Sequence, residues 1–217
     1  IRATMQRLRE SRASAILLGG DDSIVHPAVA ASPREPVGFI QIGGRLPGAI
    51  PSEEVGQSED NPPLSHLLSD GAILPRTTTV MAGAGSAGME FLRDFEAAGG
   101  TLWSASEVRQ APPGAIGRLA QSIAETAGAL HVHFDVSAFR PSLHGMSERP
   151  AFGGLTLPDL QKALGEIGRA PVPSLIVTGL NPSLSGLSVV KTGLRLTVTT
   201  LLAYIYGRLG LEAAQGP

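Results

Sequence analysis

Polar and charged side chains follow the apolar segments of this chain, where strands of a parallel sheet would end. Asp22 comes shortly after the apolar run Ala13–Gly19, and Asp135 lies within the run His131–Val136. Carboxylates that converge at strand ends can act as acid–base groups or hold a divalent cation. Asp135 is a candidate for catalysis, and Asp22 and Asp135 are candidates for metal ligands. The other side chains expected to line this pocket are Asp21, Gln41, Arg45, His133, Ser137, Arg140 and Asn181.

Composition excludes several classes of chemistry. The 217 residues contain no cysteine, which excludes a thiol nucleophile, a disulfide framework and a cysteine-based metal site. Lys and Arg number 17 against 19 Asp and Glu, so we expect neither a nucleic-acid nor a membrane partner. No apolar run approaches the roughly 18 residues that cross a bilayer, and the N-terminus lacks a signal core. We therefore expect a cytoplasmic globular protein.

Short apolar runs alternate with helical patterns along the whole chain. Strands are expected at Ala13–Gly19, Val37–Ile42, Thr77–Ala82, Thr101–Trp103, His131–Val136 and Ser174–Thr178. Helices are expected at Met5–Arg12, Ser23–Ala31, Pro63–Ser69, Met89–Ala98, Ile116–Ala127, Leu157–Ile167 and Leu187–Leu209, and a long loop at Gly43–Pro62. This order predicts an α/β fold with a parallel sheet between two helical layers. In such a fold the ligand crevice lies beyond the carboxyl ends of the strands.

One glycine-rich segment matches a nucleotide-binding pattern. Gly83–Gly88 reads G-A-G-S-A-G, follows an expected strand and precedes an expected helix. Glu107 lies about 20 residues further on, where the dinucleotide fingerprint has an acid. The motif stands in the middle of a chain with 27 glycines, so a chance match is the more economical interpretation. Dinucleotide binding is therefore kept as the third of three hypotheses.

Several post-strand segments together resemble the arginase/agmatinase (ureohydrolase) family, in sequence order. ILLGGDDSI resembles the family's strand and G-G-D-H-S, and HFDVSAFRPS resembles S-F-D-V-D-x-x-D-P-S. VGFIQIGGRLP stands in the place of the strand and D-A-H-x-D. Further matches are EDNPPLSHLL, FGGLT and VTGLNPSL. The resemblance implies a three-layer α/β/α sandwich with a mostly parallel, arginase-like sheet. It also implies a single domain over residues 1–217, with the family's first strand and helix missing upstream.

The family holds two divalent metal ions, usually manganese, whose bridging hydroxide attacks a guanidinium carbon. Carried over position by position, most of the metal ligands are replaced in this chain. The histidine of G-G-D-H-S is Asp22, and of the two aspartates in D-V-D the first survives as Asp135 while the second is Ser137. The three ligands of D-A-H-x-D fall at Gly43, Arg45 and Pro47, the proton-shuttling histidine at Asp60 and the guanidinium-binding glutamate at Gly179. The resemblance therefore implies a lost dimanganese centre. No cofactor is expected, and manganese only if this placement of the motifs is wrong.

Without metal ions, the carboxylates at the strand ends would crowd one another and raise one another's pKa. These carboxylates are Asp21, Asp22, Asp60 and Asp135, and the resemblance makes Asp60, together with Asp135, a candidate for catalysis. Arg45 and Arg140 could each pair with a carboxylate, so we expect an internal salt-bridge cluster. His133 is interpreted as a strand histidine with satisfied hydrogen bonds, and Asn181 as part of a structural turn.

Two principal functional hypotheses follow from this pattern. The first is a non-catalytic homologue: a scaffold, a regulatory subunit or a small-molecule binder, assembled as a homo-oligomer or with a related ureohydrolase. The second is an enzyme that acts on a guanidino or another C–N bond with a rebuilt pocket. Its carboxylates would be the acid–base groups, and Arg45 or Arg140 would hold a substrate anion.

Overall fold

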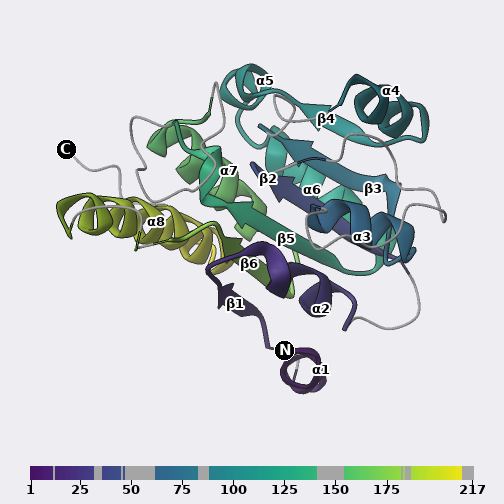
Figure 1. Cartoon of the computed structure of the whole chain (residues 1–217), viewed down its shortest axis with the longest axis horizontal. Coiled ribbons are helices and arrows are strands. Elements are labelled where there is room, and N and C mark those ends of the chain that lie inside the picture. The colour runs from purple at the N-terminus through teal and green to yellow at the C-terminus, as the bar shows by residue number, and fades with distance from the viewer. Residues whose placement is uncertain are drawn as a thin grey trace.

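Six parallel strands form one sheet with the order β1-β6-β5-β2-β3-β4 (Figure 1). The computed structural model describes residues 1–11, 13–31, 36–44, 46, 62–82, 88–140, 154–181, 183 and 187–211. The strands are β1 (Ala15–Leu18), β2 (Val37–Ile42), β3 (Ile73–Met81), β4 (Thr101–Trp103), β5 (Leu130–Asp135) and β6 (Ser174–Thr178). The predicted parallel sheet is therefore confirmed.

Helices cover both faces of this sheet (Figure 1). One face packs against α1 (Arg2–Glu10), α2 (Val25–Val29), α3 (Pro63–Ser69) and α4 (Met89–Ala97). The other packs against α5 (Ala105–Gln110), α6 (Ala115–Ala127), α7 (Leu157–Gly168) and α8 (Leu187–Arg208). Successive strand residues alternate between the layers, so that Phe39 packs with the first set of helices and Ile40 with the second. This is the three-layer sandwich that the sequence predicts.

The central strands β2 and β5 are buried at every residue. Both sides of each strand face a helical layer, and polar side chains within them must find partners inside the protein. Gln41 donates from Nε2 to the carbonyl oxygen of Gly43 (3.0 Å), and His131 Nδ1 lies 2.6 Å from Ser174 Oγ. Burial lowers the pKa of His131 to about 4.

Helix α5 was not predicted, although its entry carries a recognisable signal. Ser104 and Glu107 form a capping box: the Ser104 hydroxyl accepts from the Glu107 amide, and the Glu107 carboxylate accepts from the Ser104 amide. These hydrogen bonds lower the pKa of Glu107. The capping box gives Glu107 a structural role, so its position needs no explanation by a contact with a ribose. This weakens the dinucleotide hypothesis. The glycine motif itself lies, except for Gly88, outside the described residues.

Other differences from the predicted elements are small. Strand β3 begins at Ile73 rather than Thr77, and the expected helix Ser23–Ala31 is divided into a 3-10 turn, η1 (Asp22–Ile24), and α2. In the threonine-rich α8 the threonine hydroxyls donate to carbonyl oxygens four residues earlier, as at Thr197 and Thr200, so these polar groups find partners within the helix. None of the described helices is long and apolar enough to cross a membrane.

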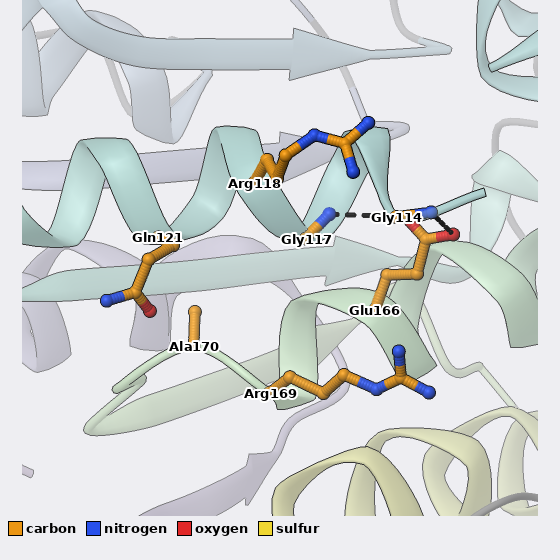
Figure 2. A pocket seen from close by; sticks show the side chains of 7 residues that line it. All are labelled: Gly114, Gly117, Arg118, Gln121, Glu166, Arg169 and Ala170. Carbon is orange, nitrogen blue, oxygen red and sulfur yellow. Dashed lines mark hydrogen bonds between the residues drawn. The ribbon is translucent and has the colours of Figure 1, made fainter. Parts of the chain in front are cut away.

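A carboxylate from α7 caps the first turn of α6 (Figure 2). Glu166 is buried, and its oxygens accept from the amides of Gly114 (2.8 Å), Ile116 (3.0 Å) and Gly117 (3.2 Å). These amides have no partner within the helix, and the positive end of the helix dipole favours the negative charge. A surface pocket surrounds this contact, and the side chains of Arg118, Gln121 and Arg169 complete its lining.

The strand order has a topological switch point between β2 and β5. The chain leaves β2 toward β3 and leaves β5 toward β6, so the two connections diverge on opposite sides of this pair. Ligands of open α/β sheets bind at such a switch point, beyond the carboxyl ends of the strands. The segments beginning at Gly43 and Val136 therefore frame the candidate site.

The depressed pKa of His131 predicts a pH-dependent stability. The unfolded histidine binds a proton near pH 6.5 and the folded one only near pH 4, so the free energy of unfolding falls as pH decreases through that window. We expect the wild-type protein to lose about 1.4 kcal/mol per pH unit more than His131→Gln. Urea denaturation at several pH values measures this, and parallel stability profiles for the two proteins would contradict it.

Replacing Glu166 should destabilise α6. We expect Glu166→Gln to lower the free energy of unfolding by about 1–3 kcal/mol, because the amides of the first turn lose a charged acceptor. Glu125→Gln is a matched control, since this exposed residue on α6 accepts only from Gln121. Its effect should stay within about 0.5 kcal/mol in chemical denaturation. Equal decreases in the free energy of unfolding for the two variants would show that the Glu166 cap stabilises α6 no more than an exposed side-chain contact does.

Candidate functional site

Three segments that are distant in the sequence meet at the carboxyl ends of β5 and β6. Asp22 begins the turn after β1, His133 lies on β5, and Thr178 ends β6. The Thr178 hydroxyl donates to Asp22 Oδ1 (2.7 Å), and the same Oγ1 lies 2.8 Å from His133 Nε2. Since the hydroxyl proton is directed at Asp22, the proton of the second contact belongs to Nε2. His133 Nε2 is also 3.6 Å from Asp22 Oδ1.

His133 is fully buried, and its two ring nitrogens differ in their contacts. Nε2 lies within hydrogen-bond distance of Thr178, whereas Nδ1 has no hydrogen-bond partner among the residues that the structure describes. One face of the imidazole ring stacks on the Phe39 ring, with the ring centroids 6.4 Å apart. The prediction of a fully satisfied strand histidine is therefore correct for one nitrogen only.

Asp135 ties the end of β5 to the turn that follows it. Its Oδ1 accepts from the Ser137 amide (2.7 Å) and caps the 3-10 turn η3 (Val136–Ala138). The Ser137 hydroxyl in turn accepts from the Gly44 amide (3.0 Å), which links the ends of β5 and β2. Asp135 Oδ2 accepts no hydrogen bond from the described residues. Asp22, His133 and Asp135 each offer one ligand atom, and all three atoms lie within 4.8 Å of one another.

The turn after β2 is built from glycines in the left-handed conformation. Gly43 has φ +72°, and a Cβ placed there would lie 2.6 Å from the Cβ of Ala138. Gly179, after β6, has φ +81°, and a Cβ there would lie 2.7 Å from Asp135 Oδ1. A side chain at either position would be strained and would collide with its neighbour. Gln41 supports this turn through its bond to Gly43 rather than facing an open pocket.

These residues do not fit a pair of manganese ions. Two-metal centres share carboxylates between ions about 3.5–4 Å apart. Gly43 offers no donor where the family pattern has a ligating carboxylate, and the Ser137 hydroxyl, at the position of another, accepts from the Gly44 amide. Among the described residues, the donors that converge are Asp22, His133 and Asp135.

The structure separates several other predicted site residues from this cluster. Asp21 is exposed, and its bonds to Ser23 lower its pKa. Arg140 is exposed and donates from Nε to the carbonyl oxygen of Gly154 (3.3 Å). Within the described part of the chain Arg140 forms no ion pair, and Asp60, one of the carboxylates expected to pair, lies outside it, so the salt bridge of Arg140 stays a prediction. Asn181 Oδ1 accepts from the Ser183 amide, as expected of a turn.

Two predicted site residues, Arg45 and Asp60, lie outside the described residues. Conversely, His133 was expected to line the pocket as a satisfied strand histidine, and its direct approach to Asp22 was not expected. The available signal was the two-residue period of a strand, which directs His133 and Asp135 to the same face of β5. The pocket beside Glu166 contains none of the cluster residues and is a separate feature (Figure 2).

Comparison with known proteins agrees with this architecture. The sequence profile of the Arginase family matches residues 1–202. No curated protein sequence gives a significant match. Formimidoylglutamase from Bacillus subtilis superposes with a TM-score of 0.77 at 17% identity, covering 98% of this chain and 67% of that one.

Two further solved structures show the same fold. Arginase from Bacillus subtilis gives a TM-score of 0.72 at 18% identity, covering 93% of this chain and 76% of that one. Trypanosoma cruzi formiminoglutamase, determined with Mn²⁺, gives 0.77 at 19% identity, covering 97% and 70%. Such low identities establish the fold alone. Because the family profile extends over most of the sequence, the chain belongs to the Arginase family.

Proposed function

We propose that this protein is an arginase-family homologue that has lost the dimanganese centre and does not hydrolyse guanidino compounds. Its role would be that of a small-molecule binder, a scaffold or a regulatory subunit. The observation that carries the proposal is the contact between Gly43 and Ala138. It fills the space where the family pattern requires an aspartate, and the left-handed backbone at Gly43 disfavours any side chain there.

Loss of the metal pair removes the means of making a nucleophile. Metal ions lower the pKa of bound water enough to provide hydroxide at neutral pH, which contributes several kcal/mol to hydrolysis. At 1.36 kcal/mol per factor of ten, this corresponds to a rate loss of about a thousandfold or more. Ser137 does not replace the missing nucleophile, because within the described residues its hydroxyl contacts the Gly44 amide rather than a histidine.

A second candidate function is supported by the convergence of Asp22, His133 and Asp135. Two carboxylates and an imidazole in one crevice are groups that move protons in hydrolytic reactions. A family member with such a rebuilt pocket could act on a guanidino or another C–N bond without a manganese pair. The side chains of His133, Thr178 and Asp22 form a hydrogen-bonded path, with Asp22 as the terminal acceptor, along which a proton can be relayed.

The first proposal predicts an inactive ureohydrolase. Incubated with Mn²⁺, the protein should release urea from arginine or agmatine, and ammonia or formamide from formimidoylglutamate, at least about a thousandfold more slowly than Bacillus subtilis arginase hydrolyses arginine. A colorimetric urea assay and mass spectrometry measure the products.

A rate comparable with that of the control enzyme, abolished by a chelator, would refute the proposal. Turnover that persists in the presence of the chelator but is lost in Asp135→Asn would instead support the second candidate function, an enzyme with a rebuilt pocket. Asp135→Asn keeps the Oδ1 acceptor for the Ser137 amide, so the turn after β5 should be preserved.

We also propose that the protein assembles with itself. Large apolar side chains recur every four residues on α8 and remain exposed: Leu194, Val198, Leu202 and Tyr206. A spacing of four aligns them along one stripe of the helix, and exposed stripes of this kind mark interaction surfaces.

Light scattering on purified protein should give a mass that is a multiple of 22.4 kDa. Val198→Glu should reduce this mass without altering the circular dichroism spectrum, because Val198 is exposed in the single chain. A monomer at micromolar concentration would contradict the proposal.

A further inference from the structure

We propose that β1 joins two copies of this chain by pairing with the β1 strand of a second copy. β1 forms one edge of the described sheet, beside β6 (Figure 1). An antiparallel contact of this kind has twofold symmetry and extends the sheet from one copy into the other. This inference rests on the proposed self-assembly, and it adds a contact that is separate from the exposed apolar stripe of α8.

The outer side of β1 carries backbone groups that the described residues leave without partners. The Ala15 amide donates to the carbonyl oxygen of Pro173, and the Gly19 amide donates to one in β6, each at 2.9 Å. Every second residue of β1 therefore faces β6. The alternation of a parallel ladder directs the amides and carbonyl oxygens of Ile16 and Leu18 to the opposite side. These four groups are available to a further strand.

The side chains of β1 are apolar, and two of them are uncovered. Ile16 is 37% exposed and Leu18 is 63% exposed, although their neighbours on β6, Leu175 and Val177, are fully buried. The four residues of β1 include no charge and no proline, and the register with β6 shows no bulge. Natural proteins protect a free sheet edge with such features, because it otherwise pairs with another chain. An edge without them is suited to pairing.

The sequence of β1 is complementary to itself in one antiparallel register. Residues whose backbone groups face the neighbouring strand must lie opposite one another as hydrogen-bonded pairs. With Leu17 of both copies at the twofold axis, Ile16 lies opposite Leu18 of the second copy, and Leu18 lies opposite its Ile16. Every outward amide and carbonyl oxygen of the two strands then has a partner, and two apolar cross-strand pairs form. A second copy therefore satisfies this edge completely.

The charges at the two ends of β1 favour the same register. Asp21 follows the carboxyl end of the strand and is exposed, whereas Arg208 lies at the amino end, where its Nη2 donates to Ser14 Oγ (3.1 Å). Antiparallel pairing brings each carboxyl end beside the amino end of the other strand. In the register centred on Leu17, Gly20 of one copy lies opposite Ser14 of the other. Asp21 therefore approaches Arg208 of the second copy, and opposite charges meet at both ends of the contact.

The test is amide hydrogen exchange of the unaltered chain over a dilution series, read by mass spectrometry with fragmentation to single residues. We expect the amides of Ile16 and Leu18 to exchange at least about tenfold more slowly in the assembled protein than in single chains, because only assembly gives them an acceptor. The Leu17 amide, which faces β6, is the internal control and should be protected at every concentration. Light scattering of the same samples gives the mass.

A charged side chain on β1 should weaken the contact. Leu18→Lys places a charge in the apolar cross-strand pair twice in each dimer, and it should raise the concentration at which half of the assembly dissociates at least about tenfold. Met89→Lys is the matched control, because Met89 is 80% exposed and begins α4, which packs beside β4 at the opposite edge of the sheet. Its midpoint should stay within about twofold of wild type.

The outcomes separate this inference from the proposals on which it rests. If the amides of Ile16 and Leu18 exchange freely in the assembled protein, or if the two lysine variants have equal effects, the pairing of β1 is overturned while self-assembly and the proposed loss of catalysis stand. Protection that persists in single chains would place another strand of the same chain at this edge and would also overturn the pairing. A protein that stays monomeric would overturn both the pairing and the proposed self-assembly.

Discussion

The contact between Gly43 and Ala138 determines which side chains can stand at the switch point between β2 and β5. Only a residue without a Cβ can hold the left-handed turn at Gly43 while the 3-10 turn after β5 packs directly against it. The neighbouring hydrogen bonds, from the Gly44 amide to Ser137 and from the Ser137 amide to Asp135, depend on that close approach. The two turns therefore form a unit in which backbone occupies the place of ligating side chains.

A different constraint governs the polar groups beside this unit. Helices cover both faces of the sheet, so polar side chains on β5 and β6 meet one another rather than water. Thr178 can accept from one neighbour and donate to another with a single hydroxyl group, and it does so between His133 and Asp22. The arrangement links a buried imidazole to a carboxylate near the surface.

Much of the fold is predictable from local pattern. Buried strands appear as continuous apolar runs, and the parallel sheet follows from their alternation with helical segments, as at Val37–Ile42 and Ser174–Thr178. The entry of α7 is recognisable from Thr156, which forms a capping box with Asp159. The first turn of α5 carries the same signal, and the shortness of that helix concealed it.

The chemistry at the strand ends is less predictable, because it depends on which strands become neighbours. The period of β5 places His133 and Asp135 on one face, but their approach to Asp22 requires β6 to lie between β5 and β1. Arg140 is a second case: the motif gives its position, but its contact with the carbonyl oxygen of Gly154 follows from the course of the backbone after Phe139. Residue type and spacing do not determine such directions.

The cap on α6 has a consequence for the kinds of molecule this protein can attract. A helix N-terminus whose amides have no other partner can bind phosphate groups. Here the Glu166 carboxylate already accepts from these amides, as a bound anion would, and it adds its own negative charge to this position. Arg118 and Arg169 nearby thus stand beside a position that is electrostatically satisfied (Figure 2). To bind at the start of α6, a phosphorylated metabolite would have to displace the Glu166 carboxylate, which belongs to the same chain and cannot diffuse away.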